Sequence, residues 1–191
     1  MTGISVGGLS RWVPLDLAVT EQGVQDYAHD LASRFPATPS VDVVAEGLAG
    51  TALDLVRGAE QDDDIRLLAA WVLTAADDDL SPIALATMRA VRFDPRGPVP
   101  DVAALVLGEG EPVSAPTVSS LATGSGPAEL GSARIALSAG RERVVHEVSA
   151  VLWSRAADGY VVALSSDVTD LVAGREVPDA VAQLAQEVKG L

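Results

Sequence analysis

The residues best suited to chemistry in this chain are two runs of three aspartates, Asp62–Asp64 and Asp77–Asp79. Clustered carboxylates can bind Mg²⁺ or Ca²⁺ through their oxygens. The apolar stretch between the runs is typical of a strand, and its 12 residues would hold the runs roughly 40 Å apart. The runs therefore cannot share an ion, and neither has the ligand spacing of a calcium loop. We expect solvated turns and no metal site.

Two histidines are candidates for general bases. His29 lies off the apolar stripe of a predicted helix, beside Asp26 and Asp30, so we expect it to be exposed on the surface. His146 is followed by Glu147 in a predicted strand, where neighbours point to opposite faces and cannot form a dyad. The chain has no cysteine, so a zinc site would depend on carboxylates, which is uncommon. The sequence assigns neither histidine a catalytic role.

Motifs of nucleophilic and nucleotide chemistry are absent from the sequence. There is no Gly-x-Ser-x-Gly turn and no Ser-x-x-Lys, and the glycine pairs around Glu109 and Ser125 do not extend into a dinucleotide or P-loop fingerprint. The sequence therefore favours a protein without enzyme activity and without a cofactor. A metal-dependent hydrolase that uses an Asp-rich turn is the enzymatic alternative.

Three tryptophans are candidates for a core or for an interface. Trp71 lies deep in an apolar strand and is expected in the core. Trp12 and Trp153 lie near the ends of predicted elements, where a partly exposed indole can contribute to an interface. We predict a core position for them first, and keep Trp12 and Trp153, together with the acidic turn Asp77, Asp78 and Asp79, as candidate interaction residues.

Composition limits the classes of partner. The formal net charge is −14, which repels phosphates and anionic lipid, so we expect neither nucleic-acid nor membrane binding. Without cysteines there are no disulfides, and the start of the chain lacks the basic and apolar regions of a signal peptide. We expect a cytoplasmic protein, and its single lysine against 12 arginines, with no asparagine, indicates a GC-rich bacterial genome.

Periodicity then predicts the elements that position these residues. A helix is expected from Thr20, its predicted N-cap, to Pro36, and a second from Ser40 to about Arg57. Gly47 and Gly50 weaken the second helix, unless they split it or permit close packing. Strands are expected over 65–76 and 83–93, followed by a long loop at 94–100. The segment 101–107 is undecided between helix and strand.

The C-terminal half is predicted to be mostly sheet. Strands are expected over 111–121 and 133–138, joined by a Gly/Ser/Pro-rich loop at 123–132, and a hairpin over 144–153 and 160–166. A helix with an apolar stripe follows from Pro178 to Val188. An edge strand such as 111–121 needs cover, which makes a homo-oligomer a candidate.

This order predicts an α+β fold: a mostly antiparallel sheet of five to seven strands, packed by two N-terminal helices and one C-terminal helix. The whole chain, 1–191, is expected to form one domain, with residues 1–10 flexible.

The order also resembles the PsbP-like fold. The similar features are the patch Trp12–Leu15, the hairpins 65–73 with 83–93 and 144–153 with 160–166, and the closing helix. That family acts mainly through non-catalytic binding or assembly, which is what the resemblance implies, and no site residue is carried over because no motif aligns. The leading hypothesis is thus a non-catalytic acidic interaction domain that binds a protein; the alternative is a small-molecule carrier.

Overall fold

Eight strands form one sheet in the computed structural model, which describes residues 9–38, 40–61, 63–94, 96–140 and 142–191. The strands are β1 (Trp12–Pro14), β2 (Ile65–Ala76), β3 (Asp79–Arg92), β4 (Glu111–Pro112), β5 (Thr117–Thr123), β6 (Gly126–Ala139), β7 (Glu142–Arg155) and β8 (Tyr160–Val168). Their order is β1-β2-β3-β8-β7-β6-β4, and β5 pairs with β6 beside β4. Every pairing is antiparallel. The predicted α+β class with a mostly antiparallel sheet is confirmed.

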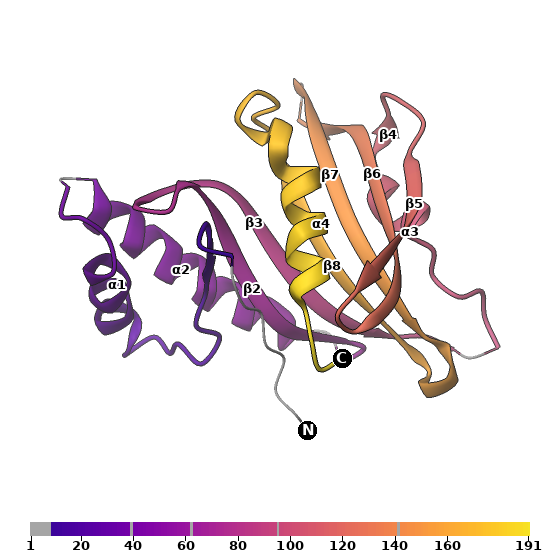
Figure 1. Cartoon of the computed structure of the whole chain (residues 1–191), viewed down its shortest axis with the longest axis horizontal. Helices are drawn as coiled ribbons and strands as arrows, with labels where there is room; N and C mark the ends of the chain where they lie inside the picture. Colours follow the sequence, from indigo (N-terminus) through magenta and orange to yellow (C-terminus); the bar gives the residue numbers. More distant parts are fainter. Residues whose placement is uncertain (1–8, 39, 62, 95, 141) are drawn as a thin grey trace.

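The helices cover the two faces of this curved sheet differently (Figure 1). They are α1 (Val24–Ser33), α2 (Val41–Ala59), α3 (Val102–Leu107) and α4 (Val177–Glu187), with short 3-10 turns η1 (Ala156–Asp158) and η2 (Ala173–Glu176). Helix α4 lies in the hollow of the sheet, on its concave face. Helix α2 covers β2 and β3 on the convex face, with α1 packed against α2, and α3 covers β6 and β7 on the same face.

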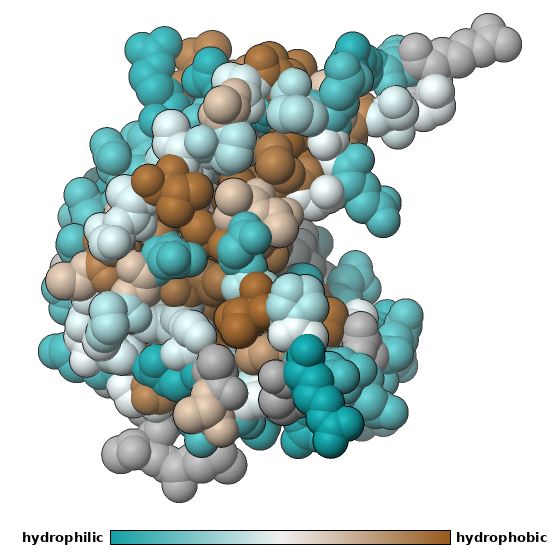
Figure 2. Space-filling model, turned by 90° about the vertical axis from the view of Figure 1, so that its right-hand side faces the viewer, coloured by the Kyte–Doolittle hydropathy of each residue, from teal (hydrophilic) through white to brown (hydrophobic). Residues whose placement is uncertain are grey.

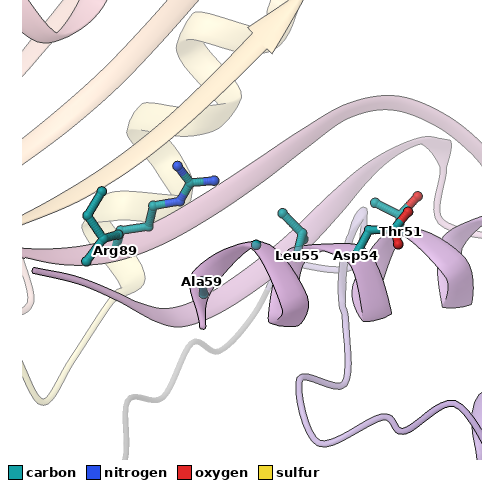
Figure 3. Close-up of a pocket in the computed structure, with 7 residues that line it drawn as sticks. Thr51, Asp54, Leu55, Ala59 and Arg89 are labelled. Atoms are coloured by element: carbon teal, nitrogen blue, oxygen red, sulfur yellow. The ribbon is translucent and has the colours of Figure 1, made fainter. Parts of the chain in front are cut away.

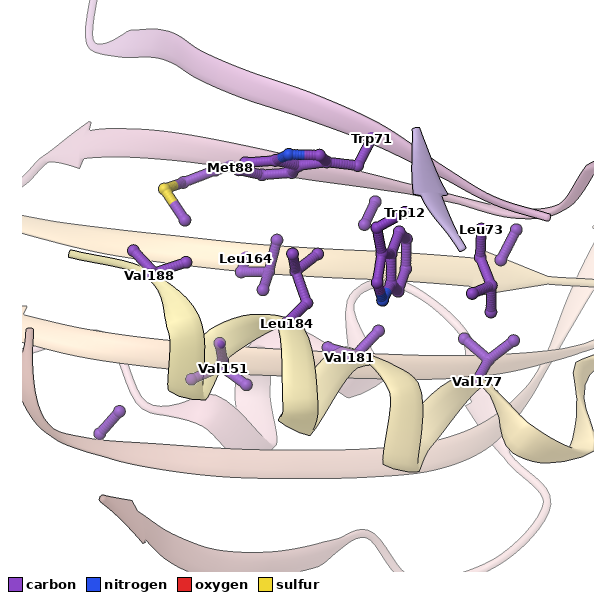
Figure 4. Packing of buried hydrophobic residues seen from close by; sticks show 14 of the residues in the cluster. Trp12, Trp71, Leu73, Met88, Val151, Leu164, Val177, Val181, Leu184 and Val188 are labelled. Atoms are coloured by element: carbon purple, nitrogen blue, oxygen red, sulfur yellow. The ribbon is translucent and has the colours of Figure 1, made fainter. Parts of the chain in front are cut away.

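The main core forms between α4 and the concave face. The predicted stripe of α4, which includes Val181 and Leu184, is completely buried. Figure 4 shows this stripe facing Trp71, Met88 and Leu164 from the central strands. Small strand residues such as Ala86 let the helix approach the sheet closely, which is how a chain with few aromatic residues fills its interior.

A β-bulge shapes the start of β2. The register shifts between Leu67, opposite Arg89, and Ala69, opposite Met88, so Leu68 is the additional residue. Both Leu68 and Ala69 consequently pack against the main core.

Two helix predictions are corrected in detail. Thr20 is not an N-cap: α1 begins at Val24, and Thr20 Oγ1 accepts a hydrogen bond from Gly23 N in the preceding turn. The undecided segment 101–107 is the helix α3, and the Asp101 carboxylate caps it by accepting a hydrogen bond from Ala104 N at 2.7 Å. The expectation of flexibility falls mainly on residues 1–8, which lie outside the described residues.

The predicted loop over 123–132 is wrong. Strands β5 and β6 are joined by a tight turn at Gly124–Ser125, and β6 already begins at Gly126, whose φ of +105° suits glycine. Gly131 belongs to the strand because Val102 of α3 packs against it, and a Cβ there would lie 2.8 Å from that side chain. Of the glycines that indicated a loop, Gly126 lies at the turn and Gly131 allows the close contact with α3.

The predicted strand 111–121 is interrupted but stays on one edge. Glu111–Pro112 and Thr117–Thr123 both pair with β6, as β4 and β5. Pro112 and Pro116 flank the break, as expected for residues without a backbone N–H.

Candidate functional site

The two acidic runs lie at opposite ends of β2. Asp77 and Asp78 form the exposed turn into β3, and Asp79 accepts hydrogen bonds from Ser81 N and Oγ at 2.9 and 2.7 Å. These bonds hold the pKa of Asp79 below its ordinary value. Asp62 lies outside the described residues, while Asp63 and Asp64 are exposed. Among described side chains, no group of three His, Asp or Glu could hold a metal ion.

The two candidate interaction tryptophans lie inside the molecule. Trp153 is completely buried, and its indole Nε1 donates to Thr123 Oγ1 at 2.9 Å. Trp12 is 6% exposed and packs in the main core with Trp71 (Figure 4). Neither indole offers a face to a partner in this structure, whereas the acidic turn Asp77–Asp79 is accessible.

A histidine–aspartate pair lies on the convex face. His146 Nδ1 is 2.8 Å from Asp167 Oδ1 and 3.0 Å from Oδ2, and the His146 side chain is 17% exposed. Sequence reasoning missed Asp167 because it considered only the neighbour Glu147. The register of the predicted hairpin could have found it: Arg155 lies opposite Tyr160, which places Val148 opposite Asp167 and His146 diagonal to it.

A shallow groove runs along α2 beside this pair. One part, about 470 Å³, lies between α2 and β3 and is lined by Thr51, Asp54 and Leu55 on the helix side and Arg89 on the sheet side (Figure 3). A second hollow, about 420 Å³, shares Thr51 and includes His146 and Asp167. No serine or threonine hydroxyl of the described residues is hydrogen-bonded to His146, as it would be in a Ser–His or Thr–His nucleophile pair.

The edge at β5 is the most distinctive surface. Strand β5 ends the sheet, and no described residue pairs with its outer side. Three large apolar side chains at this edge and on the adjoining α3 are exposed: Leu105 by 38%, Val113 by 54% and Val118 by 51%. We call β5 with these three residues the β5 surface; Figure 2 views this side, where apolar side chains gather.

Charge is missing from this edge. The chain carries no charged residue between Glu111 and Glu129, a stretch that contains all of β5. Edge strands are ordinarily protected against pairing by charges, prolines or bulges. Within β5 itself there is neither a charge nor a proline, so its backbone is available for hydrogen bonding to another strand.

Comparisons with known proteins add little. No protein-family model matches the chain, and no curated protein matches it. One solved structure, the crystal structure of LpqN, involved in cell envelope biogenesis of Mycobacterium tuberculosis, is similar at a TM-score of 0.36 and 18% identity, covering 68% of this chain and 80% of that one. This similarity is too low to support a conclusion about function. The resemblance to the PsbP-like fold stays a prediction.

No helix in the described part of the chain is long and apolar enough to cross a membrane.

Proposed function

We propose that this chain is a non-catalytic interaction domain that binds an extended segment of a protein partner along β5. The observation that supports this most is the uncharged edge strand, seven residues long, with no neighbour among the described residues on its outer side. A partner strand added there would satisfy the open backbone groups, which is the usual source of affinity in strand addition.

The side chains around β5 favour an apolar partner segment. Val118 projects to the same face as α3, because it lies opposite Gly131, against which α3 packs. Together with Leu105 it offers apolar area beside the backbone, and burial of such area contributes about 25 cal/mol per Å². Strand pairing then supplies the register, and these side chains supply the selectivity.

The strongly acidic remainder of the surface has a different role in this proposal. A net charge of −14 keeps the protein soluble and disfavours contact with nucleic acid and anionic membranes. We keep the cytoplasm as the proposed location, and a protein, either a second copy or another chain, as the proposed partner.

The test is site-specific photocrosslinking in the host cell. A photoreactive residue at Val118 should capture a partner, whereas the same residue at Val43, an equally apolar valine 69% exposed on α2, should not. The captured protein is then purified and titrated against the wild type and the Val118→Lys/Ser120→Lys variant. Because charge opposes strand addition, we expect binding to weaken about tenfold or more.

The location of the crosslinks and the affinity of the variant decide the outcome. Equal capture from positions 118 and 43, or an affinity unchanged by the two lysines, would contradict binding at β5. Covalent dimers of the chain itself would identify the partner as a second copy, and sedimentation over a concentration series would then give the dissociation constant.

A further inference from the structure

A second surface lies at the open end of the concave face, on the side of the sheet opposite to α2. The hollow there has a volume of about 850 Å³, within the range of small-molecule sites. Its walls come from the ends of β2, β3 and β8 and from the C-terminal residues Gly190 and Leu191.

Two arginines lie on one face of the sheet at this hollow. Arg66 of β2 lies opposite Ala90 of β3, and Arg92 is two residues further along the same strand. Alternation in β3 therefore places Ala90 and Arg92 on one face, and pairing places Arg66 there too. Both side chains are exposed, and neither forms an ion pair or hydrogen bond with a described residue.

The floor beneath the arginines is apolar. Leu68, turned inward at the β-bulge, lies beside Ala90 and Val162, and Leu191 closes the far side. Leu68, Ala90 and Leu191 are partly buried extensions of the main core, and Val162 belongs to it. The site thus joins two arginines at its rim to an apolar surface that is continuous with the main core.

The charges around the rim restrict the ligand. Asp63, Asp64 and Asp158 also line the hollow with Arg66 and Arg92, so its described side chains carry three carboxylates against two guanidinium groups, a formal charge of −1. These carboxylates repel a dianion such as a phosphate monoester more strongly than a monoanion, and a single carboxylate can still reach two guanidinium groups, which bind it through paired N–H donors.

We propose that this hollow binds a long-chain fatty acid, with the carboxylate between Arg66 and Arg92 and the hydrocarbon chain on the accessible parts of Leu68 and Ala90. Its occupant and location differ from those of the β5 surface. The two proposals are therefore independent, and each can be contradicted without affecting the other.

The experiment is calorimetric titration of the full chain with dodecanoate below its micelle concentration. The wild type should bind dodecanoate, and the Arg66→Gln/Arg92→Gln variant should bind it about tenfold or more weakly, because charge-assisted hydrogen bonds to the carboxylate are lost. The matched control is Arg89→Gln, on the same strand but facing α2, which should leave the affinity unchanged. Dodecanol, which lacks the carboxylate, should bind the wild type as weakly as dodecanoate binds the double variant.

Each other outcome overturns the proposal. Absence of binding to the folded wild type would do so, as would an equal loss in Arg89→Gln, or equal affinity for dodecanol and dodecanoate. Melting temperatures of all variants confirm that they fold, which is expected because these arginines are exposed. The Val118→Lys variant should bind dodecanoate like the wild type, which separates this site from the β5 surface.

Discussion

The two edges of the sheet are built in opposite ways. The edge at β1 is closed by a strand of only three residues that ends at Pro14. Backbone hydrogen bonds continue on both sides of it, from Leu15 N to Ala70 O and from Thr74 N to Arg11 O. Arg11 then forms a two-pronged ion pair with Glu176 at 2.6 and 2.8 Å, which joins this edge to the start of α4.

The edge at β5 is longer, uncharged and mostly exposed, and no described strand pairs with its outer side. Its contact with α4 is at the β5–β6 turn, where Gly124 N donates to Gln186 O at 3.0 Å. A short strand with proline is a common protection against unwanted pairing. Since one edge of the sheet is protected and the other is not, we interpret the β5 edge as the one that contacts a partner.

The largest expected effect comes from the protected edge. Trp12→Ala should lower the free energy of unfolding by ~3–5 kcal/mol, because Trp12 is 6% exposed and packs in the main core. Val118→Lys at the open edge should change it by less than ~0.5 kcal/mol. Urea denaturation measures both. A loss at Val118 comparable to that at Trp12 would mean that β5 is already covered.

The contact between α3 and the sheet next to β5 gives a medium effect. Gly131→Ala should cost about 1–3 kcal/mol, because the new Cβ would lie 2.8 Å from Val102 Cγ2. The control is Gly47→Ala in α2, where a Cβ has nothing within 4 Å; it should stabilise the protein by about 0.5–1 kcal/mol. Close packing, one explanation for Gly47 in the sequence, is therefore excluded by the structure. Stabilisation by Gly131→Ala would show that α3 is not held against β6.

The smallest effect tests the ion pair at the β1 edge. The hydrogen bonds from Arg11 hold the pKa of the Glu176 carboxyl below its ordinary value, although partial burial opposes this. The pair is partly exposed, so Arg11→Gln should cost no more than about 1 kcal/mol at neutral pH. Because the pKa of the carboxyl is lowered on folding, this contribution is present above the pKa of the unfolded chain, about 4.3, and is lost as pH falls through the folded value.

Urea midpoints of wild type and Arg11→Gln should therefore differ at pH 7 and converge as the pH falls through the lowered pKa of the folded Glu176 carboxyl. Arg175→Gln, which removes an exposed arginine without an ion pair to any described residue, is the control and should show no such pH-dependent difference. A difference that persists at low pH would assign the loss to packing of the Arg11 chain.

Much of the fold could be predicted from the sequence because its strongest patterns are local. Alternation and length predicted β2, β3, β7 and β8, and the stripe in α4 predicted which of its sides is buried. The edge position of 111–121 was also predicted and is confirmed. The loop predicted over 123–132 was wrong because its glycines were interpreted from composition alone. Gly126 adopts a positive φ at the β5–β6 turn, and Gly131 lies in a strand where α3 packs against it. Only the tertiary structure specifies these two roles.

The candidate sites were harder to predict because they depend on register. Arg66 and Arg92 are distant in sequence and meet only through the pairing of β2 with β3. His146 and Asp167 meet through the register of β7 with β8. Trp12 and Trp153 were predicted as interaction residues because they lie near the ends of strands. Both are buried in the structure: Trp12 packs beneath α4, and Trp153 is hydrogen-bonded to Thr123 beside the β5–β6 turn.

Amide hydrogen exchange, measured by NMR at concentrations where the chain is monomeric, tests the difference between the edges most directly. If the β5 edge is open, alternate amides of β5, those not bonded to β6, should exchange at close to unfolded rates. The β2 amides beside β1 should be slower by about 1,000-fold or more, the protection expected from a typical stability. Equal protection of all β5 and β2 amides would contradict the account, because it would show that β5 already has a neighbour.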